Sequence, residues 1–230
     1  MAATSTLVSD FTTQNGFTGW GTNAVLGSNG TVVLTPTSTY AGAITSQVRY
    51  DLTSSSFMAQ LVSPPNRGTG TTETRITIEA SVNNSIDFGW TDNTLYCREV
   101  INGTADPTYP GYTATQDKYL RVRHDGTSVV WETSPDGMTG WVTRRVPKVP
   151  TIPVTSVSIQ LISGYYGTEP TPGTAVWDNV NTIGDPGSGY LLMESGDRFE
   201  VEGATDDYLL DTFEATATVA PRIREMSKWR

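Results

Sequence analysis

The chain has few cysteines, histidines and charged residues. Its 230 residues include one cysteine, Cys97, so no internal disulfide can form, and one histidine, His124. Charged residues make up only 17% of the chain. No apolar run approaches the roughly 20 residues of a membrane span. These absences exclude a disulfide scaffold and a zinc centre of cysteine and histidine, and they predict that no membrane is a partner.

Negative charge is concentrated late in the chain. The formal net charge is −9, yet residues 184–220 alone hold nine acidic residues and one basic residue, whereas residues 221–230 hold four basic residues and one acidic residue. Phosphate repels such a chain and no basic stripe offsets the repulsion, so nucleic acid is not an expected partner. The opening "MAATSTLVSD" has neither the basic nor the apolar region of a secretory signal, so none is predicted.

Short strands are what the composition and the periodicity favour. The chain holds 22 glycines and 13 prolines, which disfavours long helices. Residues 74–82 alternate strictly, with Ile76 and Ile78 on one face and Arg75 and Glu79 on the other. Comparable stretches cover residues 31–37, 56–62, 157–163 and 174–182. Ten or so short strands predict an all-β, two-sheet antiparallel sandwich.

Turn residues predict two hairpins. Asp125-Gly126 lies between alternating stretches and supplies the positive φ that right-twisted strands favour. Asp92-Asn93 separates "IDFGWTD" from "TLYCREVI" in the same manner. Further along, "SPDG" at residues 134–137 has the pattern of a type I turn.

A change of composition marks the predicted domain boundary. Residues 184–189, "GDPGSG", are typical of a linker. We therefore predict a sandwich over residues 1–183 and an extension over residues 190–230, which consists of an acidic β-ribbon and a basic docking arm. A ribbon this small is marginal alone and needs a partner. The expected docking residues are the apolar ones: Tyr190, Leu191, Leu192, Phe199, Tyr208, Leu209, Leu210, Ile223, Met226 and Trp229.

Four stretches in order carry a resemblance to a known family: "FTTQNGFTGW", "VRYDLTSSSFMAQLV", "YLRVRHDGTSVVWETSPDGMTGW" and "AVWDNVNT". The set resembles the concanavalin A-like, laminin-G-like jelly-roll domains, and more narrowly the versions in minor tail proteins of phages that infect actinobacteria. The resemblance covers roughly residues 8–202. It implies a jelly-roll sandwich with a C-terminal extension, and a place in a virion.

No local motif predicts catalysis. His124 adjoins the Asp125-Gly126 turn, where a solvated surface histidine is expected, and Cys97 alternates as a core residue does. The paired carboxylates that glycosidases use have their nearest local pattern in Glu200 and Glu202, which a solvated strand face explains better. Asp87 and Asp92 do not share a face cleanly. The expectation is that the chain is not an enzyme.

The resemblance also implies a candidate metal site. Jelly-roll domains of this type often hold a Ca²⁺ that ties the first and last strands through a carboxylate and main-chain carbonyls. The matching positions are Asp178 and Asp10. Alternatively, Asp178 caps a turn or bonds to the main chain, and this reading is favoured over the metal. No other cofactor is expected.

Four tyrosines are candidates for a binding surface. Tyr109 and Tyr112 lie in "PTYPGY", and Tyr165 and Tyr166 lie in "SGYYGTEP", both rich in glycine or proline. Rings in such segments can stack on sugar C–H groups or form a protein interface, where tyrosine is enriched. The tryptophans at strand-like positions are expected in the core: Trp20, Trp90, Trp131 and Trp141.

Taken with the resemblance, these features predict a structural virion protein. The expected role is a minor tail or tail-tip protein, assembled in the host cytoplasm, that presents its sandwich for adhesion and is anchored through its extension. Its expected partners are other virion proteins, further copies of itself and a host cell-surface glycan. The alternatives are a capsid decoration protein and a carbohydrate-binding module.

Overall fold

The computed structural model describes residues 1–27, 29–66, 70–182, 190–192 and 198–200. The chain divides into two compact units, Met1–Gly184 and Asp185–Arg230. Within the described residues, no helix is long and apolar enough to cross a membrane. The helical structure described is a short 3-10 turn, η1, at Thr4–Thr6.

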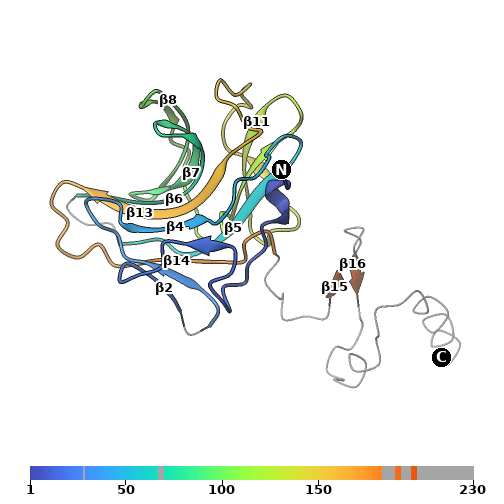
Figure 1. Ribbon diagram of the computed structural model, residues 1–230. Coiled ribbons are helices and arrows are strands. Elements are labelled where there is room, and N and C mark those ends of the chain that lie inside the picture. Colours follow the sequence, from blue (N-terminus) through green and yellow to red (C-terminus); the bar gives the residue numbers. More distant parts are fainter. Residues whose placement is uncertain (28, 67–69, 183–189, 193–197, 201–230) are drawn as a thin grey trace, which may run out of the picture. The chain divides into compact units, whose positions relative to one another are not determined.

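The first unit is a sandwich of two antiparallel seven-stranded sheets (Figure 1). The β6 sheet has the order β1-β4-β13-β6-β7-β8-β9, with bounds Phe17–Thr18, Gly42–Ser46, Ser158–Tyr166, Thr71–Ser81, Asn84–Thr91, Thr94–Ile101 and Thr104–Thr108. The β5 sheet has the order β12-β11-β10-β5-β14-β3-β2, with bounds Val142–Thr143, Val129–Ser134, Tyr119–His124, Ser56–Ser63, Ala175–Asp178, Val32–Leu34 and Ala24–Leu26. The predicted jelly-roll sandwich is confirmed.

One apolar core lies between the two sheets. Ile76 and Ile78 of β6 are fully buried in it, as the alternation of residues 74–82 predicts. The buried rings of Trp90, Trp131 and Trp177 fill its centre. Trp177 Nε1 donates to Thr74 Oγ1 over 2.8 Å, so one buried polar group satisfies another across the sandwich.

Trp20 and Trp141 differ from the prediction that they are core residues. Trp20 is partly buried and packs against the core. Trp141 lies in the segment between β11 and β12, where its ring stacks 3.6 Å from the guanidinium of Arg121. That guanidinium belongs to the polar side of β10, so Trp141 covers the outside of its sheet instead of entering the core.

Both predicted hairpins form. Asp92 and Asn93 have φ values of 46° and 68° and join β7 to β8. Gly126, at φ 98°, lies in the turn from β10 to β11. His124, however, is 6% exposed, and its Nδ1 accepts from the main-chain N–H of Gly126 over 3.2 Å. The prediction of a solvated histidine is wrong, because the turn folds back over the ring.

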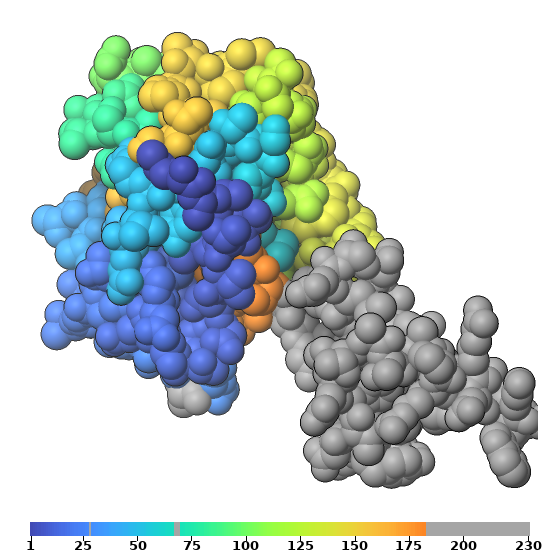
Figure 2. Space-filling model, turned by 45° about the vertical axis from the view of Figure 1, so that its right-hand side comes forward, coloured from blue at the N-terminus to red at the C-terminus, as the bar shows by residue number. Residues whose placement is uncertain are grey.

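The N-terminal segment closes the sandwich against the last strand. Ser9 and Val180 exchange main-chain hydrogen bonds of 3.1 and 2.8 Å. Asn181 Nδ2 donates to the carbonyls of Thr4 and Leu7. Figure 2 shows the dark blue N-terminal residues lying beside the orange residues near 180. The segment before β1 therefore meets the segment after β14, although more than 160 residues separate Ser9 from Val180.

Part of the extension is described. β15, Tyr190–Leu192, pairs antiparallel with β16, Arg198–Glu200, so that Leu191 is opposite Phe199. The other expected docking residues lie outside the described residues: Tyr208, Leu209, Leu210, Ile223, Met226 and Trp229.

Candidate functional site

The outer face of the β6 sheet, directed away from the core, gathers charged and aromatic side chains. The register places Asp87 of β7 opposite Thr77 of β6 and Arg98 of β8. It likewise places Arg75 opposite Gly89, and Gly89 opposite Tyr96. We call this region the charged face, and its residues are Tyr40, Glu73, Arg75, Thr77, Glu79, Asp87, Tyr96, Arg98, Gln160 and Tyr166.

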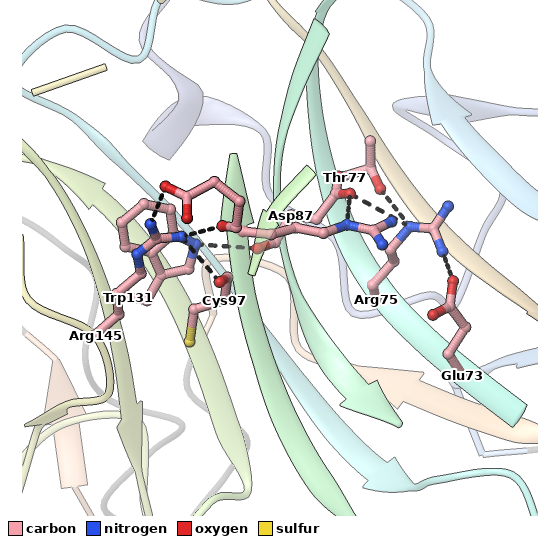
Figure 3. A network of polar contacts seen from close by, with 9 residues as sticks. Glu73, Arg75, Thr77, Asp87, Cys97, Trp131 and Arg145 are labelled. Atoms are coloured by element: carbon pink, nitrogen blue, oxygen red, sulfur yellow. Dashed lines mark hydrogen bonds and ion pairs between the residues drawn. The ribbon is translucent and has the colours of Figure 1, made fainter. Parts of the chain in front are cut away.

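Ion pairs run across the charged face from strand to strand (Figure 3). Arg98 Nε donates to Asp87 Oδ2 over 2.7 Å, and Arg75 Nε lies 3.9 Å from the same oxygen. Arg75 also donates to Thr77 Oγ1 over 3.1 Å and pairs with Glu73. Asp87 therefore lies between two guanidinium groups from the strands on either side of it.

These charges are largely removed from water. Asp87 is 2% exposed and Glu73 is 4% exposed. Although burial opposes it, the pKa of the Arg75 guanidinium is raised well above its usual value by Tyr96, Asp87 and Glu73. Burial of charge is costly unless the charges are paired and hydrogen-bonded, as these are.

Three buried oxygens of the charged face have no hydrogen-bond partner among the described residues: Tyr40 Oη, Tyr96 Oη and Asp87 Oδ1. Asp87 Oδ1 is buried and accepts no hydrogen bond from any of the described residues. A buried carboxylate oxygen without a donor costs about 1–3 kcal/mol or more. Because this oxygen has almost no surface open to solvent, no ligand can offset that cost from outside.

Contacts from the core side fix the strand that carries Asp87. Trp131 Nε1, from the opposite sheet, donates to the main-chain carbonyl of Asp87 over 3.0 Å (Figure 3). The guanidinium of Arg145 lies 5.1 Å from the Trp131 ring and donates to the carbonyl of Cys97 over 3.1 Å. The position of Asp87 is thus set by both sheets.

Two glycines make room for the large side chains of the charged face. A Cβ at Gly89 would lie 2.2 Å from the carbonyl oxygen of Thr74 and 2.5 Å from Cβ of Arg75. A Cβ at Gly164 would lie 2.2 Å from the ring of Tyr40. Without a side chain at these positions, Arg75 and Tyr40 can lie close against the sheet.

Aromatic rings border the cluster. The Tyr40 and Tyr166 rings are 5.4 Å apart, and the guanidinium of Arg75 lies 4.9 Å from the Tyr40 ring. Arg98 lies 5.0 Å from the ring of Tyr96. Tyr166 is 54% exposed, so one ring face is open to a ligand.

A pocket of about 230 Å³ opens on the charged face. The buried carboxylate of Asp87 borders it, as do the two arginines. All its lining residues but Val100 are polar or charged, and they come from four neighbouring strands and one hairpin: Arg75, Thr77, Glu79, Ser81, Asn83, Asn84, Ser85, Asp87, Arg98, Val100 and Gln160.

The four predicted tyrosines do not form one surface. Tyr165 and Tyr166 end β13 instead of lying in a loop, and only Tyr166 belongs to the charged face. Tyr109, beyond β9, is 60% exposed. Tyr112 is partly buried against the core, and burial raises its pKa to about 12. The expectation that both rings of "PTYPGY" stand free of the core is therefore wrong for Tyr112.

Asp10 lies near enough to Asp178 for its charge to act on that carboxyl group. Burial raises the pKa of Asp178 and the charge of Asp10 raises it further, while a bond from the N–H of Asn179 opposes the shift. Asp178 Oδ1 accepts this bond over 2.7 Å, which is the local capping favoured above. Two carboxylates beside main-chain carbonyls are donors of the kind that Ca²⁺ accepts. No group of three acidic, histidine or cysteine side chains suited to a metal occurs among the described residues.

Cys97 and His124 do not act as a pair. Cys97 belongs to the core cluster, and burial raises the pKa of its thiol to about 12 although Arg145 and Arg144 lower it. The Nδ1 atom of His124 already accepts from Gly126 and lies 3.4 Å from the N–H of Ser54. A thiolate nucleophile activated by this histidine has no structural support.

Sequence comparison finds neither a matching family model nor a similar curated protein. The fold, by contrast, is similar to that of several solved structures. A Crh5 transglycosylase in complex with NAG has a TM-score of 0.54 at 12% identity, over 80% of this chain and 87% of that one. Porphyranase B from Zobellia galactanivorans has a TM-score of 0.52 at 9% identity, over 78% and 91%. A xylan beta-1,4-xylosidase from Bacillus halodurans C-125 has a TM-score of 0.55 at 11% identity, over 76% of this chain but only 38% of that one.

These comparisons confirm the concanavalin A-like jelly roll and correct one expectation. The prediction that the chain is not an enzyme is wrong, because the structures that share its fold include a transglycosylase and glycosidases. That prediction relied on finding paired carboxylates within one stretch of sequence. The carboxylates of the charged face come from two strands, β6 and β7, and no local motif joins them.

Proposed function

We propose that the chain binds an oligosaccharide on the charged face. The observation that carries the proposal is the pocket of the charged face, which the side chains of Arg75, Arg98 and Gln160 line and which the carboxylate of Asp87 borders. Sugar hydroxyls donate and accept at fixed spacings, so they match a pocket whose lining combines guanidinium and amide donors with carboxylate and hydroxyl acceptors. The carboxylate disfavours a purely anionic ligand there.

The exposed ring of Tyr166 supports the same reading. An aromatic face can pack against the C–H groups of a sugar ring, while polar neighbours set its orientation. Tyr166 and the pocket lie on the same face of the sheet, because Tyr166 is an even number of positions along β13 from Gln160. One chain of several sugar units could contact both.

Support also comes from proteins of similar fold. Their names include a transglycosylase bound to NAG, a porphyranase and a xylosidase, all proteins that act on or hold sugars. At identities of 9–12%, these similarities establish a shared fold and no shared activity. The ligand class is therefore proposed from the residues of the charged face.

Calorimetric titration tests the proposal with N-acetylglucosamine oligomers, xylo-oligosaccharides and porphyran oligosaccharides. At least one series should bind, and Tyr166→Ala should weaken its binding by roughly tenfold, the equivalent of one aromatic contact. Asp87→Ala should weaken it as much or more. Tyr109→Ala removes an exposed ring outside the charged face and serves as the matched control. Equal affinity in all three variants would refute this location.

A place in a phage particle is a further proposal, and it rests on the sequence resemblance alone. In that setting the charged face would be the adhesion surface for a host glycan, and the second unit, Asp185–Arg230, would anchor the chain. The test is to delete residues 187–230 and to measure incorporation of the chain into particles. Normal incorporation would remove the anchoring role.

A further inference from the structure

We propose that residues 145–150, "RVPKVP", are a docking site for a protein module whose aromatic-lined groove binds polyproline II helices. We call these six residues the proline segment. The proline segment lies in the connection from β12 to β13, and none of its residues lines the pocket of the charged face. The proposal is therefore independent of the glycan binding proposed above.

The sequence of the proline segment repeats every three residues. A valine-proline pair occurs at Val146-Pro147 and again at Val149-Pro150, with Lys148 between them. A polyproline II helix has three residues per turn, so the two valines form one ridge along it and the two prolines form a second ridge. Proline fixes its own φ near the polyproline II value and biases the preceding residue toward the same region. Two prolines at this spacing are the pattern that grooves for such helices bind.

Burial in the structure follows the same period. The side chains of Arg145 and Lys148, three positions apart, turn toward the sandwich and are 10% and 29% exposed. Val146 and Val149, the next position in each case, are 83% and 64% exposed, and Pro147 is exposed as well. A β-strand would instead alternate every two residues. The proline segment therefore presents its valine-proline pairs outward and keeps its cations on the inner side.

The inner side is fastened to both sheets. Arg145 donates to the main-chain carbonyl and to the carboxylate of Asp106 on β9, each over 2.6 Å. Lys148 Nζ donates to the same carboxylate over 2.8 Å. The main chain of Lys148 exchanges hydrogen bonds of 3.0 and 2.8 Å with Val129 on β11. A partner therefore meets a segment that is already ordered, which lowers the entropic cost of binding.

The prolines exclude another use of this edge. The proline segment lies beside β11 at the edge of the β5 sheet, where a partner could add a strand. Pro147 and Pro150 have no N–H to donate, so the row of main-chain donors that strand addition requires is broken twice. The outer side is left with apolar side chains at polyproline II spacing. Aromatic rings are the surface that packs against such valine-proline pairs.

The inner position of the cations predicts how binding depends on salt. Arg145 and Lys148 both pair with Asp106, and Lys148 Nζ also lies 2.9 Å from Glu99. A partner that packs on the valines and prolines therefore meets cations whose charge is already compensated. Such binding should change little with salt, whereas binding through the cations should weaken as the salt concentration rises.

The test titrates the full chain by calorimetry with three isolated modules that have grooves of this kind, an SH3 domain, a WW domain and an EVH1 domain. At least one should bind with a micromolar dissociation constant, and the constant should change less than about twofold between about 0.1 M and about 1 M salt. Val146→Ala and Pro147→Ala should each weaken binding by roughly tenfold, because each removes an exposed apolar contact. The matched control is Val82→Ala, which removes a valine of 79% exposure from the turn between β6 and β7 and should bind as the parent does.

Three results would overturn the proposal. The first is no binding to any of the three modules, and the second is an equal loss of affinity in Val146→Ala and Val82→Ala. The third is a loss of affinity of tenfold or more at the higher salt concentration, which would assign the binding to the cations. Light scattering on the chain alone separates a further occupant. A dimer that Val146→Ala converts to a monomer would mean that a second copy covers the valines, and this too would overturn the proposal.

Discussion

At the scale of single residues, Asp136 shows how one side chain can organise a turn. Its carboxylate accepts from the N–H groups of Met138 and Thr139, each over 2.8 Å, and from the hydroxyls of Ser134 and Thr139. Although partial burial opposes them, these bonds lower the pKa of Asp136 to about 2. The turn that "SPDG" predicts is thus held by the aspartate as well as by the backbone preferences of proline and glycine.

Asp136→Ala should therefore cost about 1 kcal/mol of stability at pH 7, the usual value of such bonds. Because the pKa is lowered in the folded chain, this contribution is complete above the ordinary value of 3.8 and disappears as the pH falls through about 2. Urea unfolding at pH 7, 4, 3 and 2 measures it. Asp136→Asn, which keeps an acceptor, should lose less and show little dependence on pH. An equal loss for the alanine variant at pH 7 and pH 2 would contradict this account.

Cys97 gives a second prediction at this scale. Its pKa of about 12 leaves little thiolate near pH 8, and the side chain is fully buried. A thiol reagent should react roughly a thousandfold more slowly with the folded chain than with the chain in guanidinium chloride. Absorbance of the released chromophore measures both rates. Similar rates in the two states would show that β8 opens readily.

At the scale of elements, one carboxylate fastens a long connecting segment. Glu99 of β8 is 1% exposed, and its Oε1 accepts from the N–H groups of Thr151 and Ile152 over 2.6 and 3.2 Å. Its Oε2 lies 2.9 Å from Lys148 Nζ. Lys148 also bonds to the carboxylate of Asp106 on β9. The segment between β12 and β13 is therefore held against the edge of the β6 sheet.

Glu99→Gln should lower the free energy of unfolding by about 2–3 kcal/mol, because it leaves a buried polar network incomplete. Asp106→Asn removes the other partner of Lys148, but that carboxylate is 57% exposed, so the loss should be below about 1 kcal/mol. Urea unfolding measures both variants. Trypsin should cleave near Lys148 faster in the first variant alone. Equal losses would mean that burial of Glu99 contributes nothing.

The same scale explains what the sequence could and could not predict. Ile76 and Ile78 mark the core side of β6 by alternation alone, and Asp92-Asn93 marks the hairpin of β7 and β8, because both signals are local. In the sequence, Arg75 and Glu79 resemble a solvent-exposed strand face. A strand that lines a pocket and a strand that faces bulk water show the same alternation of polar and apolar residues. The surroundings of Asp87 depend on Arg98 and Arg75, which lie on neighbouring strands. The sequence of a single strand does not specify its register with the next strand.

At the scale of the whole molecule, the sandwich depends on joining its two chain ends. Ser9 and Val180 pair through the main chain, and the carboxylates of Asp10 and Asp178 lie near this junction. The pKa of Asp178 is raised, so its charged form is disfavoured in the folded chain. Without a cation, closure of the sandwich therefore brings together two negative charges.

Asp178→Asn should consequently raise the melting temperature in EDTA by a few degrees, at most about 4 °C for a chain of this size. Because the folded pKa is raised, the penalty is absent below the ordinary pKa of 3.8 and develops as the pH rises through the folded value, so parent and variant should melt alike near pH 3.

If Ca²⁺ binds between Asp10 and Asp178, millimolar Ca²⁺ should raise the melting temperature of the parent and leave the variant unchanged. Mg²⁺, which prefers a smaller octahedral site, is the control. If the parent has the same melting temperature in EDTA and in Ca²⁺, no Ca²⁺ binds at this site. If the variant melts at a lower temperature than the parent in EDTA, repulsion between the two carboxylates is excluded.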